Sequence, residues 1–349
     1  MKRSFICLII LFLVGFPMDV LSQQGRGRGK NPLMAELTVY PAKDSKAGQK
    51  YQLLVKADEQ SEADAMGLYE KAAKSLPEDI NPEQLKQWSD TPPDKLPRKQ
   101  VEKTLQRFKA SVQLVEQAAR CGKCRWPEED KNLSSYRKLA YVLALQAHLK
   151  IAEGKHDEAI GVIQTGLTMG NHIGQGPTIV QGMVGVAISA LMVKQVEEFV
   201  QLPDAPSLYG ALKALPKPFI DLNKQIELER ENLKKYNPLL RKQFEEVSKP
   251  GYDRVRVIMK RLDRNIAVLQ CVEALRLYAG TSDGKFPKEL SNITEVDVPL
   301  DLVTGKPFVY SLAGSKAVLK GPAPKGAGAE DPKGAGAEEA LRYELNLKE

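Results

Sequence analysis

Apolar residues recur three or four positions apart through most of the middle of the chain, and this spacing is typical of amphipathic helices. One stripe lies in 101–115, formed by Val101, Leu105, Phe108, Val112 and Val115. Another follows Pro250-Gly251, extends from Ile258 to Tyr278 and stops at Gly280. The pattern predicts a mainly α-helical protein, with a repeat-like antiparallel helical domain over 61–249 and then a small α+β C-terminal module.

The clearest helix pair spans 136–153 and 157–169 and is joined by Gly154-Lys155-His156. Such a turn allows two antiparallel helices to bury facing apolar stripes. The run from Gly154 to Ile160, followed by Gly166-Leu167, resembles the second half of the tetratricopeptide repeat. The resemblance implies close helix approach at the small residues and a concave partner-binding surface. Because only one unit is covered, we expect a repeat-like domain and not a full solenoid.

After the long helix, a Gly-x-x-Pro-x-x-Leu element (284–290) is followed by Asp-x-x-x-Gly-x-Pro-x-x-Tyr (301–310) and by apolar alternation at 317–319. Together with the helix these elements resemble the exported part of type II secretion pseudopilins, over 265–322. The resemblance implies a loop and a short antiparallel sheet. No pilin-type N-terminal helix is present, so we interpret the segment as a borrowed module. Calcium ligation is not carried over, because only Asp301 lies at a matching place.

Taken whole, the chain resembles a set of exported bacterial helical proteins of unknown function. They join an early Tyr-x-Leu-Leu strand (51–54), an Ala-x-x-Leu-Tyr-x-x-Ala helix (65–72) and a Cys-x-Trp element (124–126). This resemblance supports the architecture and implies no chemistry. The residues themselves also predict short strands at 37–40 and 51–55.

The first 22 residues have the layout of a secretory signal peptide, with Lys2 and Arg3 before an apolar run and a cut expected after Ser22. The run has about 12 residues, short of the roughly 20 that span a bilayer, so cleavage is favoured over an uncleaved anchor. We therefore expect export to the periplasm or beyond the cell, with membrane contact only through this segment if it is retained. The apolar stretch 179–193 is also short, and we interpret it as a buried central helix.

Low-complexity segments complete the predicted domain order. Residues 23–60 are expected to form a flexible tether and short strands, and 250–322 the long helix and pseudopilin-like module. The Gly/Ala-rich segment 323–341 contains a repeated Lys-Gly-Ala-Gly-Ala-Glu and lacks the bulky residues that would bury area, which predicts a disordered loop. Residues 342–349 are a possible last strand.

Composition and charge narrow the class of partner. With 349 residues, 42% of them hydrophobic and 6% aromatic, the chain can build a packed core and is neither collagen-like nor wholly disordered. The net charge of +7 is mildly basic. A candidate anion contact lies on the long helix, formed by Arg256, Lys260 and Arg264. Acidic neighbours dilute this stripe and export disfavours nucleic acid, so a solvated face is the main interpretation.

Cys121-Gly122-Lys123-Cys124 is the most reactive-looking feature, since two thiols three positions apart can form a disulfide or a redox pair. A structural disulfide is the favoured interpretation in an oxidising compartment, with unpaired thiols or redox chemistry as alternatives. The histidines His148, His156 and His172 have no metal-ligand spacing, so we expect neither a metal nor a cofactor. The sequence contains no nucleophile elbow and no phosphate-binding glycine loop.

These patterns predict a non-catalytic role. We expect an exported helical scaffold or protein-binding module that recognises an unknown protein partner at a helical groove near 136–169. One alternative is a thiol-disulfide exchange protein that uses Cys121 and Cys124. Another is an accessory component of a secretion or pilus-like assembly.

Overall fold

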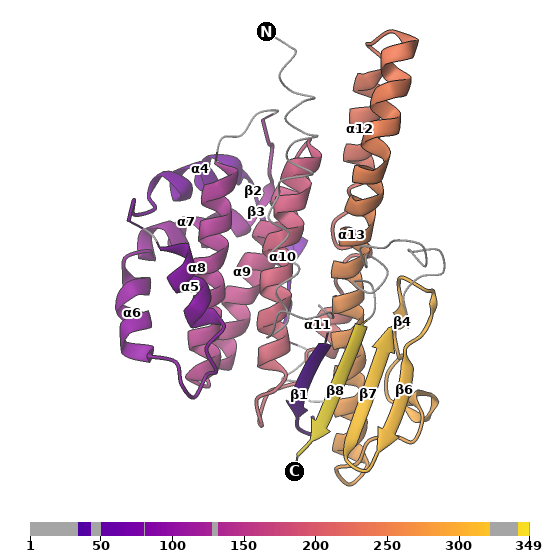
Figure 1. Cartoon of the computed structure of the whole chain (residues 1–349). Helices are drawn as coiled ribbons and strands as arrows, with labels where there is room; N and C mark the ends of the chain where they lie inside the picture. The colour runs from indigo at the N-terminus through magenta and orange to yellow at the C-terminus, as the bar shows by residue number, and fades with distance from the viewer. Residues whose placement is uncertain (1–33, 43–49, 80, 128–131, 322–340, 349) are drawn as a thin grey trace.

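A computed structural model describes residues 34–42, 50–79, 81–127, 132–321 and 341–348. The expected signal peptide over 1–22, residues 23–33 and 43–49 of the expected tether and nearly all of the Gly/Ala-rich loop therefore lie outside the described residues. The protein is mainly α-helical, as the pattern predicts, with a small sheet built mostly from its C-terminal part (Figure 1).

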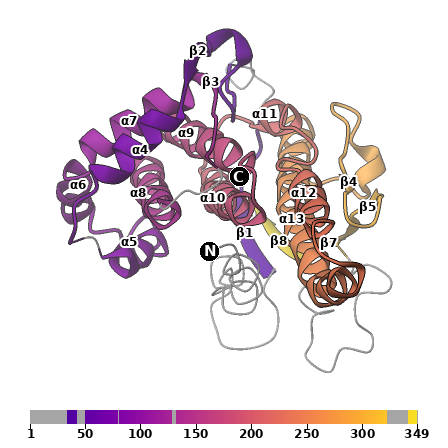
Figure 2. The same cartoon turned by 90° about the horizontal axis from the view of Figure 1, so that it is seen from above.

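The longest helices of the body follow one another in the chain and pack side by side. Helix α8 contacts α9, α9 contacts α10, and α10 also contacts α13. Shorter helices cover the outer side, with α5 and α6 on α8 and α4 on α7 (Figure 2). The helices are α4 (Met66–Lys74), α5 (Pro82–Ser89), α6 (Arg98–Gln106), α7 (Lys109–Ala119), α8 (Leu133–Ala152), α9 (His156–Gly174), α10 (Ile179–Phe199), α11 (Tyr209–Lys213), α12 (Asn223–Leu233) and α13 (Pro238–Thr281).

The expected α8–α9 pair is present, and its turn uses Gly154 at φ +68°, a backbone conformation that glycine adopts without strain. Most side chains of both helices are buried. Neighbouring helices cover α8, and α10 and α7 contact α9. Most of the pair therefore packs inside the body, and the groove expected near 136–169 stays a prediction.

Glycines allow α9 and α10 to pack unusually close together. A Cβ built on Gly185 would lie 2.5 Å from the Cα of Gly174 and 2.6 Å from the carbonyl oxygen of Gly170. Within the described residues, α10 is the one helix long and apolar enough to cross a membrane by length and composition. Its most apolar 18-residue window is 67% buried in the protein, so the predicted central buried helix is confirmed.

The main sheet joins the two ends of the described chain. Its strand order is β1-β8-β7-β6, with β1 parallel to β8 and the other pairs antiparallel. Met34 is paired with Arg342, so the strand predicted at 37–40 belongs to the C-terminal sheet. The strands are β1 (Met34–Val39), β6 (Val309–Ala313), β7 (Lys316–Gly321) and β8 (Leu341–Leu347); two small pairs are β2 (Ser61–Asp64) with β3 (Cys121–Lys123) and β4 (Leu300–Asp301) with β5 (Lys306–Pro307).

Residues 51–55 do not form the strand that the sequence predicts. The segment lies along α9, where the Gln164 side chain donates hydrogen bonds to the carbonyl oxygens of Gln52 (3.1 Å) and Leu54 (3.2 Å). The Val55 N–H donates to the Thr168 hydroxyl at 3.4 Å. Helix side chains therefore satisfy the backbone groups that a neighbouring strand would otherwise pair with.

Two helix boundaries also differ from the prediction. The long helix begins at Pro238 and not after Pro250-Gly251, so the predicted boundary at 249/250 falls inside α13. Pro250 is exposed, and water can satisfy the carbonyl group that loses its helical partner there. The stripe over 101–115 is divided between α6 and α7.

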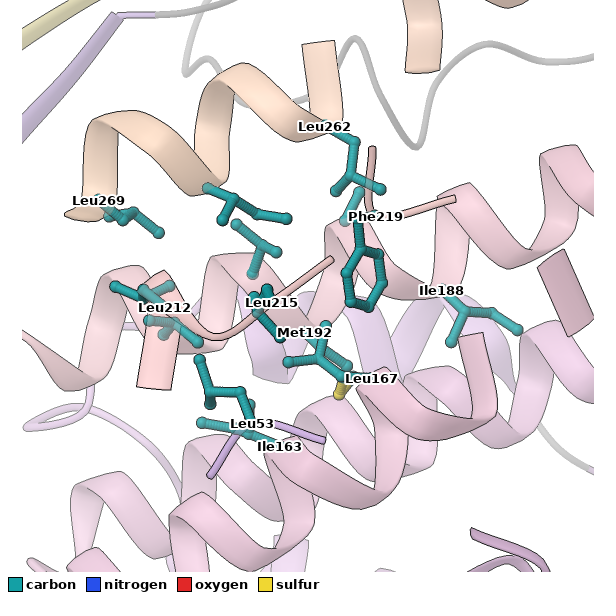
Figure 3. Close-up of a cluster of buried hydrophobic side chains, with 14 of the residues drawn as sticks. Leu53, Ile163, Leu167, Ile188, Met192, Leu212, Leu215, Phe219, Leu262 and Leu269 are labelled. Carbon is teal, nitrogen blue, oxygen red and sulfur yellow. The ribbon is translucent and has the colours of Figure 1, made fainter. Parts of the chain in front are cut away.

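One continuous core joins segments far apart in the chain. In Figure 3, Leu53 meets Ile163 and Leu167 of α9, while Leu212 and Phe219 approach Leu262 and Leu269 of α13. The helical body and the C-terminal module therefore share their packing.

Candidate functional site

A groove of about 870 Å³ lies between α11, the loop 288–298 and the ends of β4, β5 and β6. Its walls come from three separated stretches of the chain. They include Tyr209, Lys213, Leu290, Ile293, Glu295, Asp297, Leu300, Phe308 and Tyr310. Pockets that bind small molecules or peptide side chains have similar volumes, roughly 300–1,000 Å³.

The Gly-x-x-Pro-x-x-Leu element forms one wall of this groove. Gly284 takes φ +66° just after α13, which reverses the chain direction. Leu290 starts the short 3₁₀ helix η2 (Leu290–Asn292) and is buried. The Tyr310 hydroxyl donates to the carbonyl oxygen of Pro287 at 2.8 Å, so the last residue of the second motif fixes the loop of the first.

Helix α11 is held in place by a buried charged pair on α13. Arg276 and Glu273 are both inaccessible to solvent and lie 2.6 Å apart. Arg276 also donates to the carbonyl oxygen of Ala205 (2.9 Å), and the Ser207 hydroxyl donates to Glu273 (2.7 Å). Since the N–H of Tyr209 donates to that same hydroxyl group at 3.2 Å, the pair fixes the start of α11.

A polar clamp joins α11 to the opposite wall. The Lys213 Nζ and the Asp297 carboxylate lie 2.6 Å apart, and the Tyr209 hydroxyl donates to the carbonyl oxygen of Asp297 at 2.6 Å. The hydrogen bond from Lys213 lowers the pKa of Asp297, and the same bond raises the pKa of Lys213. Both side chains are at least half exposed, so a charged ligand could exchange with either member.

Both apolar and charged side chains line the groove, and Leu300 in this lining is 48% exposed although it is a large hydrophobic residue. Val309 is 54% exposed and lies between Phe308 and Tyr310, which line the groove. Val309 begins β6, an outer strand of the four-stranded sheet that is paired with β7 on one side. An outer strand presents backbone N–H and C=O groups that can pair with another extended chain.

The two cysteines singled out in the sequence lie far from the groove, on and after β3. Cys121 is buried and its free thiol donates a weak hydrogen bond to the carbonyl oxygen of Gln117 (Sγ–O 3.5 Å). The expected Cys121–Cys124 disulfide is therefore not formed in this structure, because Cys121 faces helix α7. Their pairing after export stays a prediction.

The Cys-x-Trp element (124–126) packs against the helical body through Trp126. The Trp126 ring stacks on Tyr69 with centroids 6.1 Å apart, and Tyr136 packs edge-on against Trp126 at 5.5 Å. The Trp126 indole N–H donates to the carbonyl oxygen of His172 at 2.7 Å. The element therefore packs into an aromatic cluster and anchors its loop there.

The structure does not bring Arg256, Lys260 and Arg264 together as a basic stripe. Arg264 is buried and donates to the Asp301 carboxylate at 2.8 Å, while Arg256 pairs with Asp253 at 3.1 Å. Lys260 alone is exposed. The expectation of a solvated face is therefore wrong for Arg264, because the sheet covers this part of α13.

The histidines are also dispersed. His148 is buried between the Glu198 carboxylate and the Thr91 carbonyl oxygen, 2.5 and 2.8 Å from its ring nitrogens. Burial lowers its pKa, but the bond to Glu198 and its charge outweigh this effect and leave the pKa raised. His172 accepts or donates a hydrogen bond with the Tyr69 hydroxyl at 3.0 Å, and burial lowers its pKa to about 4. Within the described residues, no group of three His, Cys, Asp or Glu side chains could hold a metal ion.

Sequence reasoning located one wall of the groove and missed the other. The motifs at 284–290 and 301–310 carry the loop and the strands, whereas Tyr209 and Lys213 belong to a short helix without a motif. Their placement depends on the buried Arg276–Glu273 pair, which contacts residues about 70 positions away. Comparison with family models, with curated proteins and with solved structures finds no match to this chain.

Proposed function

We propose that the protein is an exported, non-catalytic scaffold that binds an extended segment of a partner protein in the groove beside α11. The observation that carries this proposal is the combination of the groove, its exposed lining residue Leu300 and the adjoining outer strand β6. A peptide added beside β6 would gain backbone hydrogen bonds, and the groove would take one of its side chains.

The chemistry of the walls favours a particular kind of segment. Leu300 in the groove and the exposed Val309 on the adjoining strand suit apolar side chains, whereas Lys213 and Asp297 can each contact a charged group. We therefore expect an extended peptide with an apolar residue next to a charged one. This replaces the helix pair over 136–169 as the proposed docking surface, because most of that pair is buried.

The structure bears differently on the two alternatives, thiol-disulfide exchange and an accessory role in an assembly. Thiol-disulfide exchange requires an accessible attacking thiolate, and the burial of Cys121 does not favour it. An accessory role in a secretion or pilus-like assembly rests on the resemblance of 265–322 to pseudopilins. In that role the partner would be another component of the assembly, and it could bind in the same groove.

Crosslinking in the native envelope tests the binding proposal. A photoreactive residue in place of Val309 should give a defined adduct, which the substitution Leu300→Asp should reduce at least several-fold. A photoreactive residue in place of Val247, which is similarly exposed but lies on α13 outside the groove, is the control. Equal adducts at both positions would contradict the proposal.

Export needs its own measurement. N-terminal sequencing of the protein purified from its native host should find Gln23 as the first residue. A chain that retains 1–22 and stays in the cytosol would overturn the predicted export and leave the groove proposal to be judged by the crosslinking alone.

A further inference from the structure

A helical hairpin extends well beyond the rest of the described molecule. Helix α12 and the first part of α13 form its two arms (Figure 1). Asn237 caps α13 by accepting a hydrogen bond from the N–H of Leu240 at 3.0 Å, with Pro238 in the first helical position. The Tyr236 and Phe244 rings pack edge-on at 5.4 Å. The tip, residues 232–244, therefore has a defined shape.

Large apolar side chains at this tip are turned toward solvent. Leu239 is 69% exposed, Leu240 is 40% exposed and Tyr236 is 37% exposed. Leu239 is the most exposed of the large hydrophobic residues that the structure describes. Three such residues within five positions, at a projecting end, are typical of a surface that contacts something else.

The same tip carries four cations, Lys234, Lys235, Arg241 and Lys242, and its sequence from 232 to 244 contains no Asp or Glu. Lys234 pairs with Glu231 and Arg241 pairs with Glu245, and every one of these side chains is at least 45% exposed. Exposed pairs of this kind are weak, so both cations can exchange their partners for phosphate groups. Lys235 donates to the neutral Asn232 side chain at 2.7 Å.

We propose that the tip of the α12–α13 hairpin docks onto an anionic lipid surface. Leucines and a tyrosine at the apex would enter the headgroup region, while the flanking cations would contact lipid phosphates. Charge complementarity selects this occupant, because a bilayer rich in anionic lipid matches four cations that surround a convex apolar end. Such contact is separate from the groove and from the N-terminal segment, where the sequence alone placed any membrane contact.

Flotation of the purified mature chain with vesicles tests the proposal. The protein should bind vesicles of phosphatidylglycerol and not those of phosphatidylcholine, with binding that falls as salt is raised. The double variant Leu239→Ser and Leu240→Ser should weaken binding about tenfold or more. Exchange of Lys234, Lys235, Arg241 and Lys242 for Gln should remove the preference for phosphatidylglycerol.

The controls Leu228→Ser and Val247→Ser remove exposed apolar side chains from the same hairpin, outside the tip, and should bind like the parent chain. Thermal unfolding of each variant checks that the fold persists, which exposed sites favour. Failure of the parent chain to bind phosphatidylglycerol, or equal binding by the tip and control variants, would overturn the proposal. So would self-association that the tip variants abolish while vesicle binding is absent, because the tip would then contact a second copy.

Discussion

The two halves of α13 use the same kinds of charged residue for opposite purposes. In the projecting half, Arg241 pairs with Glu245 one turn away, and both are exposed. In the half within the body, Arg264 pairs with Asp301 of β4, and both are buried. One continuous helix therefore contains charges that pair only with their own helix and charges that fix distant segments. Burial and tertiary contacts decide between the two roles, and the local sequence does not.

Exposed and buried ion pairs should differ strongly in their contribution to the free energy of unfolding. Exposed pairs contribute at most about 1 kcal/mol, because water and salt screen them. Removing one member of a buried pair leaves the other charge without compensation in a poorly solvated place, which costs about 3–5 kcal/mol. Substitutions in the body and on the projecting half of α13, together with a change of pH, can test this difference in stability.

The largest effect is expected for Arg276→Ala. This change leaves the Glu273 carboxylate buried without its partner and removes hydrogen bonds to the carbonyl oxygens of Tyr40 (3.0 Å) and Ala205 (2.9 Å). The free energy of unfolding should fall by about 3–5 kcal/mol. Urea denaturation measures it.

The same variant should loosen the segment after β1, because the Arg276 side chain donates to the carbonyl oxygen of Tyr40, and only the backbone bond from the N–H of Ala42 to residue 276 (2.9 Å) would remain. Limited proteolysis should then cut near 40–50 sooner than in the parent chain. A loss of stability no larger than that of an exposed arginine would contradict the distinction between the two halves.

Acid should weaken the body through His172. Its pKa is about 4 in the folded protein and about 6.5 in an unfolded chain, so the unfolded state gains the proton first as the pH falls. Stability should decrease between pH 6.5 and 4 by about 3 kcal/mol from this residue, and change no further below. His172→Gln should reduce that decrease in urea denaturation at the two pH values.

The pKa of His148 is shifted in the opposite direction to that of His172, so His148 serves as an internal check. Its pKa is raised in the folded state, so its contribution is complete below pH 6.5 and is lost as the pH rises through the folded pKa. His148→Gln should therefore reduce the loss of stability as the pH rises above 6.5. It should not change the loss of stability between pH 6.5 and 4, which comes from His172. An identical pH profile in both variants would refute these assignments.

A substitution in the contact between α9 and α10 should have a smaller effect on stability than Arg276→Ala. Gly185→Ala places a methyl group against the backbone of Gly174 and should cost about 1–3 kcal/mol. Gly161→Ala is a matched control on α9, because a Cβ there meets nothing within 4 Å. The control should be neutral or stabilise by up to about 1 kcal/mol. Similar thermal midpoints for the two variants would argue against close contact of α9 and α10.

The smallest effect is expected for Arg256→Ala. Its partner Asp253 lies one turn away and is 58% exposed. Stability should change by less than about 1 kcal/mol and the change should shrink further at high salt. A loss that approaches that of Arg276→Ala would show that the projecting half of α13 is not energetically separate from the body.

The sequence was sufficient for features that depend on local pattern. Asn81 followed by Pro82 is a typical start of a helix, and α5 begins there, with the Asn81 side chain accepting from the N–H of Gln84 at 3.2 Å. The apolar stretch within α10 was interpreted correctly as buried. Both signals are local, since one is a cap and the other an unbroken apolar run.

What the sequence could not supply depends on distant contacts. Arg264 follows the same spacing as Arg256, yet Asp301 and the backbone at Gly321 enclose it; a Cβ on Gly321 would lie 2.6 Å from its guanidinium carbon. Residues 51–55 have the composition of a strand, but Gln164 and Thr168 satisfy their backbone groups. The groove was missed for the same reason, because α11 reaches it through Arg276.

The parallel pairing of β1 with β8 has a kinetic consequence. The ribosome releases β1 early, yet its only neighbour in the sheet, among the described strands, is synthesised long afterwards. Closing so long a loop delays the final native contacts, since contact order is the main determinant of folding speed. The four-stranded sheet therefore cannot be completed until both ends of the described chain have been synthesised.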